Sequence, residues 1–174
     1  WASDGSFAGT RQARDVLPGV GSGLGPKLGV MAGRAWFAGT DDGVSASLWS
    51  SDGTEAGTQK IKSAAGDTGS DPRVFTRSGS GSYFIADDGA HGRELWFTDG
   101  SEAGTRLVKD VRAGAAGGVT EVLGTLEDGT LIFRADDGSG SALWQSDGTE
   151  AGTSLVSDAR LRPEHVQLSH LTAF

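Results

Sequence analysis

Residues 95–105 read LWFTDGSEAGT, and close copies of this stretch recur along the chain. The four copies are marked by tryptophans at matching places: Trp1, Trp49, Trp96 and Trp144. Successive tryptophans are separated by 48, 47 and 48 residues. A fixed period of this size is typical of propellers, solenoids and other repeat arrays.

One repeat unit predicts four short β-strands. Within residues 73–111, apolar and β-branched segments at 74–77, 82–86, 94–98 and 105–111 alternate with turns rich in Gly, Asp and Ser. The connections are too short for the crossovers that parallel strands need, so the pairing is expected to be antiparallel. Four strands in about 47 residues match one propeller blade. We therefore expect an all-β fold, a β-propeller of four-stranded antiparallel blades.

The repeat boundaries predict a single propeller domain or propeller segment over residues 1–174. The expected units are a partial blade at 1–16, complete blades at 17–62, 63–111 and 112–159, and the first strand of a further blade at 160–174. Incomplete terminal blades expose strand edges that can pair with other strands. Two interpretations remain: the chain is part of a longer propeller, or a second copy completes the terminal blade.

The recurring tryptophans are expected to hold neighbouring blades together. Side chains alternate along a strand, so the leucines that precede them, Leu48, Leu95 and Leu143, should face the opposite way. In the second strand, the repeat alignment places Ala38 with Phe84 and Phe133. The same alignment places Trp36 with Ser82 and Leu131, so Trp36 breaks the repeat.

An Asp-Gly pair follows each recurring tryptophan. A carboxylate at this place can accept backbone N–H groups two residues on, and glycine can adopt a positive φ. The loop can therefore be explained by folding alone. The aspartates are Asp4, Asp52, Asp99 and Asp147.

Composition argues against several classes of partner. The formal net charge is -8, with 15 basic residues scattered among 23 acidic ones. Proteins that neutralise phosphates carry clustered Lys and Arg, so nucleic acid is not an expected partner. No apolar run approaches the roughly 18 residues of a membrane span, and membrane insertion is not expected. No signal peptide is read in this chain, and the absence of cysteine leaves no disulfide or thiolate site.

An Asp-Asp-Gly turn recurs after the second strand and raises the question of calcium. The candidate ligands are Asp42, Asp88 and Asp137. Carboxylates suit this hard cation, but none of the three turns has the spaced ligand set of an EF-hand loop. Turn capping explains them as well, so no cofactor is expected and calcium stays a weak alternative.

No catalytic set is visible in the sequence. His91, His165 and His170 occupy unrelated places in the repeat, and no Gly-x-Ser-x-Gly elbow is present. The glycine-rich stretch 19–27 fits no phosphate-binding pattern. Binding sites are often built from loop residues on a rigid scaffold. The candidates for ligand binding are His91 and Arg93, which lie on the longest turn and are not repeated, and Trp36, which could stack on a sugar.

Several motifs together resemble the bacterial ELWxxDGT repeat family. They are Ala-Asp-Asp-Gly at 86–89, Glu-Leu-Trp at 94–96, Asp-Gly at 99–100, Gly-Thr at 104–105 and Leu-Val-Lys-Asp at 107–110. Other copies depart from this pattern, with Ser47 and Ala142 in place of Glu94. The resemblance covers essentially the whole chain and implies propeller-forming repeats in a secreted or surface-exposed bacterial protein. It implies no particular activity and no catalytic residues.

Three functional hypotheses follow. The first is a non-enzymatic binding or display module that recognises a protein or a glycan through its rim loops. The second is a propeller lectin with one sugar site per blade. The third is a hydrolase or lyase with a single site in the central funnel.

Overall fold

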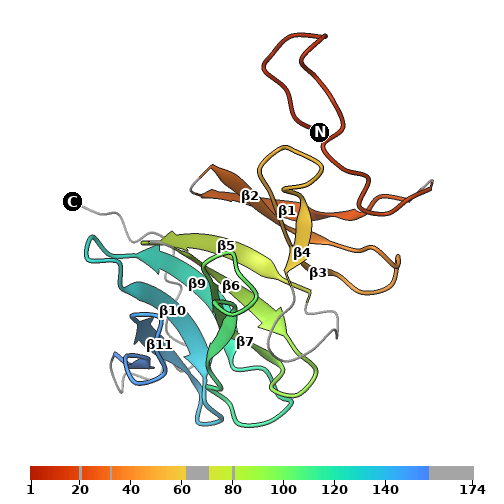
Figure 1. Ribbon diagram of the computed structural model, residues 1–174. Coiled ribbons are helices and arrows are strands. Elements are labelled where there is room, and N and C mark those ends of the chain that lie inside the picture. Colours follow the sequence, from red (N-terminus) through yellow and green to blue (C-terminus); the bar gives the residue numbers. More distant parts are fainter. Residues whose placement is uncertain (20, 32, 62–70, 80, 157–174) are drawn as a thin grey trace.

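The chain folds into three four-stranded antiparallel sheets (Figure 1). The computed structural model describes residues 1–19, 21–31, 33–61, 71–79 and 81–156. The first sheet contains β1 (Leu24–Met31), β2 (Arg34–Gly39), β3 (Ser47–Ser51) and β4 (Gln59–Ile61). The second contains β5 (Arg73–Ser78), β6 (Gly81–Asp87), β7 (Arg93–Thr98) and β8 (Arg106–Lys109). The third contains β9 (Val119–Thr125), β10 (Leu131–Asp136), β11 (Ser141–Ser146) and β12 (Ser154–Leu155).

In each sheet the strands follow one another in chain order. The predicted all-β class and the antiparallel pairing within each repeat are confirmed. The sheets lie within the expected units 17–62, 63–111 and 112–159, whereas the strand expected at 160–174 falls outside the described residues. No helix in the described part of the chain is both long and apolar enough to cross a membrane.

The sheets pack face to face, and β5–β8 lies between the other two (Figure 1). Trp96 packs with residues of the first sheet, and Leu95 packs with residues of the third. Trp144 of the third sheet packs in turn against the second. Each of these tryptophans therefore contacts the preceding sheet, while the leucine before Trp96 contacts the following one, as strand alternation predicts.

The strand register corrects the sequence alignment in the first unit. Trp49 pairs with Phe37, as Trp96 pairs with Phe84. The counterpart of Phe84 is therefore Phe37 and not Ala38. The sequence alignment followed the Asp-Asp-Gly turn, which is displaced by one residue relative to the strands in this unit. A displacement of one residue exchanges the two faces of a strand.

This correction changes the role of Trp36. Trp36 stands opposite Ser50, as Tyr83 stands opposite Phe97 and Ile132 opposite Gln145. Its counterparts are thus Tyr83 and Ile132 rather than Ser82 and Leu131. Trp36 points to the second sheet and Tyr83 to the third, so both occupy the same interface position.

The first tryptophan does not join a sheet interface. Trp1 is 80% exposed, and its segment forms only an isolated bridge between Ala2 and Arg11. The expectation that all four tryptophans are buried between blades is wrong for Trp1. Trp1 lies outside the three described sheets and lines an open cavity beside the first sheet, which leaves its ring exposed.

The loops that follow the tryptophans share one hydrogen-bond network. In each copy, the Asp carboxylate accepts the N–H of the residue two positions on, at 2.8 to 2.9 Å, together with that residue's hydroxyl group. That hydroxyl oxygen accepts the N–H of the loop's last glycine. The threonine that ends the loop donates its hydroxyl to a carbonyl four residues back. The Asp-Gly motif is therefore a folding element, as its turn chemistry predicts.

The last glycine of each loop makes room for the carboxylate. A Cβ atom at Gly104 would lie 2.0 Å from an oxygen of Asp99, and at Gly152 it would lie 2.1 Å from the carboxylate of Asp147. No carbon atom fits at that distance. The spacing of Asp and Gly in the repeat is thus fixed by the closure of the loop.

The two environments of the tryptophans predict different stabilities. Trp96→Ala should lower the free energy of unfolding by about 3–5 kcal/mol, because it empties a buried interface position. Trp1→Ala, at an exposed position, should change it by no more than about 0.5 kcal/mol. Urea unfolding followed by far-ultraviolet circular dichroism measures both. Equal losses in the two variants would contradict the different roles given to the repeats.

The loop network predicts coupling between Asp147 and Gly152. Gly152→Ala should destabilise the native chain, because the new methyl group meets the carboxylate. The same change should cost less in an Asp147→Ala background, where that carboxylate is absent. A double-mutant cycle by urea unfolding should give a coupling energy of about 0.5–3 kcal/mol. Strict additivity would show that the carboxylate does not restrict the glycine.

Candidate functional site

Two arginines lie at the end of the second sheet where β5 and β7 begin, which is called the Arg93 edge below. Arg93 begins β7, and Arg73 begins β5. Both guanidinium groups donate to Oδ2 of Asp71, with a distance of 2.8 Å from Arg93. The side chains of Arg73 and Arg93 remain 54% and 39% exposed. One carboxylate therefore orients two basic groups while leaving them open to solvent.

His91 lies two residues before Arg93 in the loop between β6 and β7. Its Nδ1 is 2.7 Å from Oδ2 of Asp88, whose Oδ1 accepts the N–H groups of Ala90 and His91. The hydrogen bond to Asp88 raises the pKa of His91. Burial alone would raise the pKa of Asp88, but the hydrogen bonds from His91 and Ala90 outweigh it and lower that pKa. His91 is thus held as a partly exposed hydrogen-bonding group with increased positive character.

The backbone beside this edge is strained. Asp71 has a φ of +39° and Val74 a φ of +54°. A positive φ is unusual for a β-branched residue and costs of the order of 1–3 kcal/mol. Strain of this kind accumulates at binding sites, where a side chain must be held in one place. Here it occurs next to the carboxylate that orients Arg73 and Arg93.

The sequence candidates separate in the structure. His91 and Arg93 are two residues apart in the chain, and the side chain of each is 39% exposed. Trp36 differs, because its side chain is only 2% exposed and packs among Leu48, Phe84 and Trp96. A buried ring offers no face to a sugar, so the assignment of Trp36 to ligand binding is wrong. His165 and His170 lie outside the described residues.

The Asp-Asp-Gly carboxylates act as turn caps. Oδ1 of Asp42 accepts the N–H groups of Ser45 and Val44 and the hydroxyl of Thr40, which lower its pKa to about 2. Asp137 accepts the N–H of Ser139, and Asp88 is bonded as described above. Within the described residues, no group of three or more His, Cys, Asp or Glu side chains is placed to hold a metal ion. The described geometry therefore gives calcium no ligand set.

Glu94 is a buried carboxylate that the sequence did not identify as a candidate. Its side chain is fully buried, and Oε1 accepts the N–H groups of Gly118 at 2.8 Å and Arg112 at 3.2 Å. Oε2 has no hydrogen-bond partner among the described residues. Burial raises the pKa of Glu94 to about 7 against the effect of these backbone donors. The sequence did contain one sign of this role, because the other units have Ser47 and Ala142 in place of Glu94.

The position of Glu94 explains its structural role. It projects from β7 and ties down the connection between β8 and β9, which carries Arg112 and Gly118. Asp110, in the same connection, helps to raise the pKa of Glu94 by charge repulsion. Its Oδ1 is also buried without a partner among the described residues. Glu94 therefore fastens the β8–β9 connection to β7 through two backbone N–H groups.

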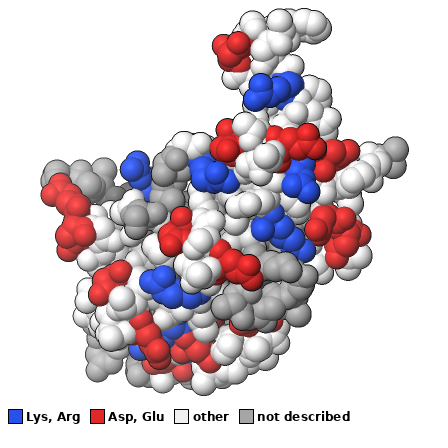
Figure 2. All heavy atoms as spheres, viewed as in Figure 1, with Lys and Arg blue, Asp and Glu red and all other residues white. Residues whose placement is uncertain are grey.

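The charged side chains form no area of one sign on the visible face. Figure 2 shows acidic and basic groups interspersed across it. The pairs include Lys60 with Asp41 at 3.2 Å and Arg134 with Glu121 at 3.3 Å. Exposed pairs of this kind contribute little to stability. The edge at Arg73 and Arg93 differs because one carboxylate, that of Asp71, accepts hydrogen bonds from two guanidinium groups.

Comparison of the chain with protein-family models, with curated proteins and with solved structures gives no match. The local geometry therefore carries the functional argument.

The buried Glu94 predicts a stability that depends on pH. Because its pKa is higher in the folded chain, the folded chain binds this proton more tightly than the unfolded chain does. Stability is then fully present below the ordinary value of 4.5 and falls as the pH rises through about 7. The loss should be about 3 kcal/mol between pH 4.5 and pH 8. Glu94→Gln should remove this component, as measured by urea unfolding across that range. An equally steep decline in the variant would assign the effect to other groups.

The turn-capping role of Asp42, Asp88 and Asp137 predicts that chelators have no effect on folding. The midpoint of thermal unfolding should be the same with excess EDTA as with added calcium, because backbone N–H groups already occupy these carboxylates. Differential scanning calorimetry provides the measurement. A calcium-dependent increase in the midpoint would identify a metal site that the described geometry does not contain.

Proposed function

We propose that the chain is a non-enzymatic binding or display module whose ligand, a protein or a glycan, docks on the edge that contains His91 and Arg93. The observation that carries this proposal is that two groups of polar residues have different roles. The repeated Asp, Ser and Thr side chains close the loops in each copy. The basic side chains at this edge are not repeated, remain partly exposed and are oriented by carboxylates.

The chemistry of this edge suits a ligand with several acceptor oxygens. Guanidinium groups donate several hydrogen bonds in a fixed plane, and a protonated imidazole donates from both nitrogens. Prior orientation by Asp71 and Asp88 lowers the entropy lost on binding. Carboxylates of an acidic sugar or of a protein side chain are ligands of this kind.

The scaffold proposed for this module is a β-propeller of the ELWxxDGT repeat type. Two successive sheet interfaces are built in the same way, with Trp96 and Trp144 each facing the preceding sheet. This arrangement of four-stranded antiparallel sheets supports the proposal. The placement of the module outside the cell or on a bacterial surface rests on the sequence resemblance.

A lectin with one sugar site per sheet receives less support. Such a lectin needs equivalent polar groups at each unit. Gly92 and Arg93 of the second unit correspond by strand pairing to Ser45 and Ala46, which have no cationic side chain. The geometry therefore favours one asymmetric site.

Ligand arrays test this proposal directly. The labelled chain is applied to an array of neutral and acidic glycans and to immobilised acidic peptides, and positives are titrated by calorimetry. We expect one site per chain, weakened at least about tenfold by Arg93→Ala and by His91→Ala, because each removes a charge-assisted hydrogen bond. Arg77→Ala is the matched control, since Arg77 is exposed near the other end of β5.

The alternative outcomes are distinct. Several equivalent sites would support the repeat-by-repeat lectin instead. Undiminished binding by both the Arg93 and His91 variants would place the ligand elsewhere. A response to acidic peptides alone would identify a protein as the partner.

A further inference from the structure

The outer face of the first sheet adjoins a cavity. Phe37 and Trp49 lie on the side turned away from the second sheet and are 6% and 3% exposed. Among the described residues, Val16 is the one partner they have in a buried apolar cluster. A cavity of about 230 Å³ opens between this face and the N-terminal segment. Ala13, Val16, Ala35 and Phe37 line it, together with Trp1. For comparison, a cavity of about 150 Å³ can take up benzene.

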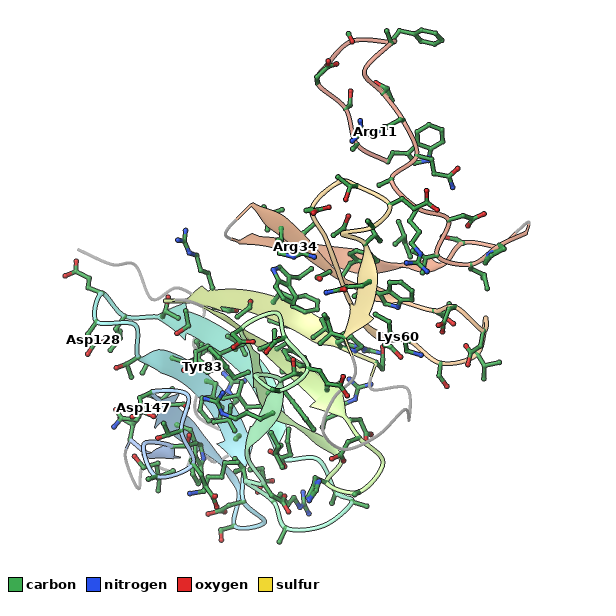
Figure 3. All side chains as sticks on the ribbon, viewed as in Figure 1. Arg11, Arg34, Lys60, Tyr83, Asp128 and Asp147 are labelled. Carbon is green, nitrogen blue, oxygen red and sulfur yellow. The ribbon has the colours of Figure 1, made fainter. Side chains whose placement is uncertain are left out.

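The N-terminal segment contacts this sheet as one sheet contacts the next. Arg11 donates to the carbonyl of Gly53 at 3.4 Å, and Arg14 donates to the carbonyl of Thr58 at 2.8 Å. At the interface between the second and third sheets, two side chains make the equivalent bonds. Arg106 donates to Gly148 at 2.9 Å and Lys109 donates to Thr153 at 3.1 Å. The segment is therefore positioned like the last strand of a preceding sheet, and Figure 3 shows Arg11 in the N-terminal loop beyond β1–β4.

The internal interfaces show what fills the equivalent space. Between the second and third sheets, Tyr83 and Ile85 of β6 pack together with Leu95 of β7. The hydroxyl of Tyr83 lies so close to Gly148 that a Cβ atom there would be 2.8 Å away. Figure 3 shows Tyr83 between the strands of these two sheets.

Trp36 occupies the same position at the preceding interface. Its ring lies over Gly100, at 2.7 Å from where a Cβ atom would be. An aromatic side chain from the second strand of one unit thus covers the Asp-Gly turn of the next unit at both complete interfaces. At Gly53 the atom nearest to such a Cβ is the methyl carbon of Ala2, at 3.4 Å, and no aromatic ring is recorded there in the described part of the chain.

We propose that the groove formed by this cavity and residues 1–3 binds one extended β-strand from another repeat unit of the same type. The strand pairs antiparallel with residues 1–3, as β6 pairs with β7. The register follows from that pairing. The aromatic residue of the bound strand stands opposite Ala2 and covers Gly53. The aliphatic residue two positions later in the bound strand faces Phe37 and Trp49. Binding is by strand addition, in which backbone hydrogen bonds give affinity and alternate side chains give specificity.

The strand can be supplied as an extension of the chain itself. The segment 81–95, which reads GSYFIADDGAHGREL, is placed directly before Trp1, so that its last leucine precedes Trp1 as Leu95 precedes Trp96. We expect the thermal midpoint to rise by roughly 5 °C or more, because buried apolar contacts are added. We also expect tryptophan fluorescence to shift to shorter wavelength as Trp1, which is 80% exposed, becomes covered.

Two controls make this experiment specific. In the first, the added counterparts of Tyr83 and Ile85 are replaced by serine, which keeps the length of the extension but removes its apolar side chains. In the second, Ala35→Glu places a carboxylate in the groove, on the same face of β2 as Phe37. Both should abolish the rise in midpoint, and Ala35→Glu should leave the unextended chain close to its original midpoint.

A synthetic peptide of residues 81–95 tests the same contact between separate molecules. Saturable quenching or a blue shift of the tryptophan fluorescence is expected, and a scrambled peptide should give neither. Equal midpoints for the intact and serine-substituted extensions, or peptide binding that survives Ala35→Glu, would overturn the proposal. Ligand binding at Arg93 lies on a different sheet, so failure there leaves this result unaffected.

Discussion

The structure depends on the packing of each sheet against the next through large side chains on both faces. An antiparallel sheet commonly has one face in water. The second sheet here has none, because Trp96 and Phe84 face the first sheet while Leu95 and Tyr83 face the third. Such a sheet is stable only between neighbours, which makes the strand register a strict requirement. A shift of one residue would turn both apolar rows to the wrong side.

This dependence on neighbours explains the behaviour of the ends of the array. Trp96 and Trp144 are buried against a preceding sheet, Trp49 is buried beside Val16 of the N-terminal segment, and Trp1 is 80% exposed. The same physics leaves Phe37 and Trp49 with a sparse cluster and an adjoining cavity. An apolar cavity beside an unpaired strand edge favours association with another strand. The groove proposed as a docking site is thus a direct result of how the sheets are stabilised.

The polar residues, unlike the apolar ones, mostly make hydrogen bonds within their own loop. The loops after the tryptophans satisfy their own hydrogen bonds, so their Asp, Ser and Thr side chains are occupied whatever the function of the chain. Specific interactions must then come from residues outside this network. Glu94 secures the connection between two sheets, and Arg93 and His91 provide oriented donors at an edge. A repeated scaffold with unrepeated edge residues can acquire a ligand without changing its core.

The sequence by itself determined the all-β class, the antiparallel strands within each unit and the folding role of the Asp-Gly loops. These features depend on local chemistry, namely side-chain alternation, turn residues and the exact repetition of a short pattern. It also located His91 and Arg93 as unrepeated loop residues. Only the tertiary structure decided that Trp36 is buried, that Phe37 rather than Ala38 pairs with Trp49, and that Glu94 reaches the linker at Gly118. Those outcomes depend on which face meets a neighbouring sheet, and a one-residue displacement of a turn is enough to reverse that assignment.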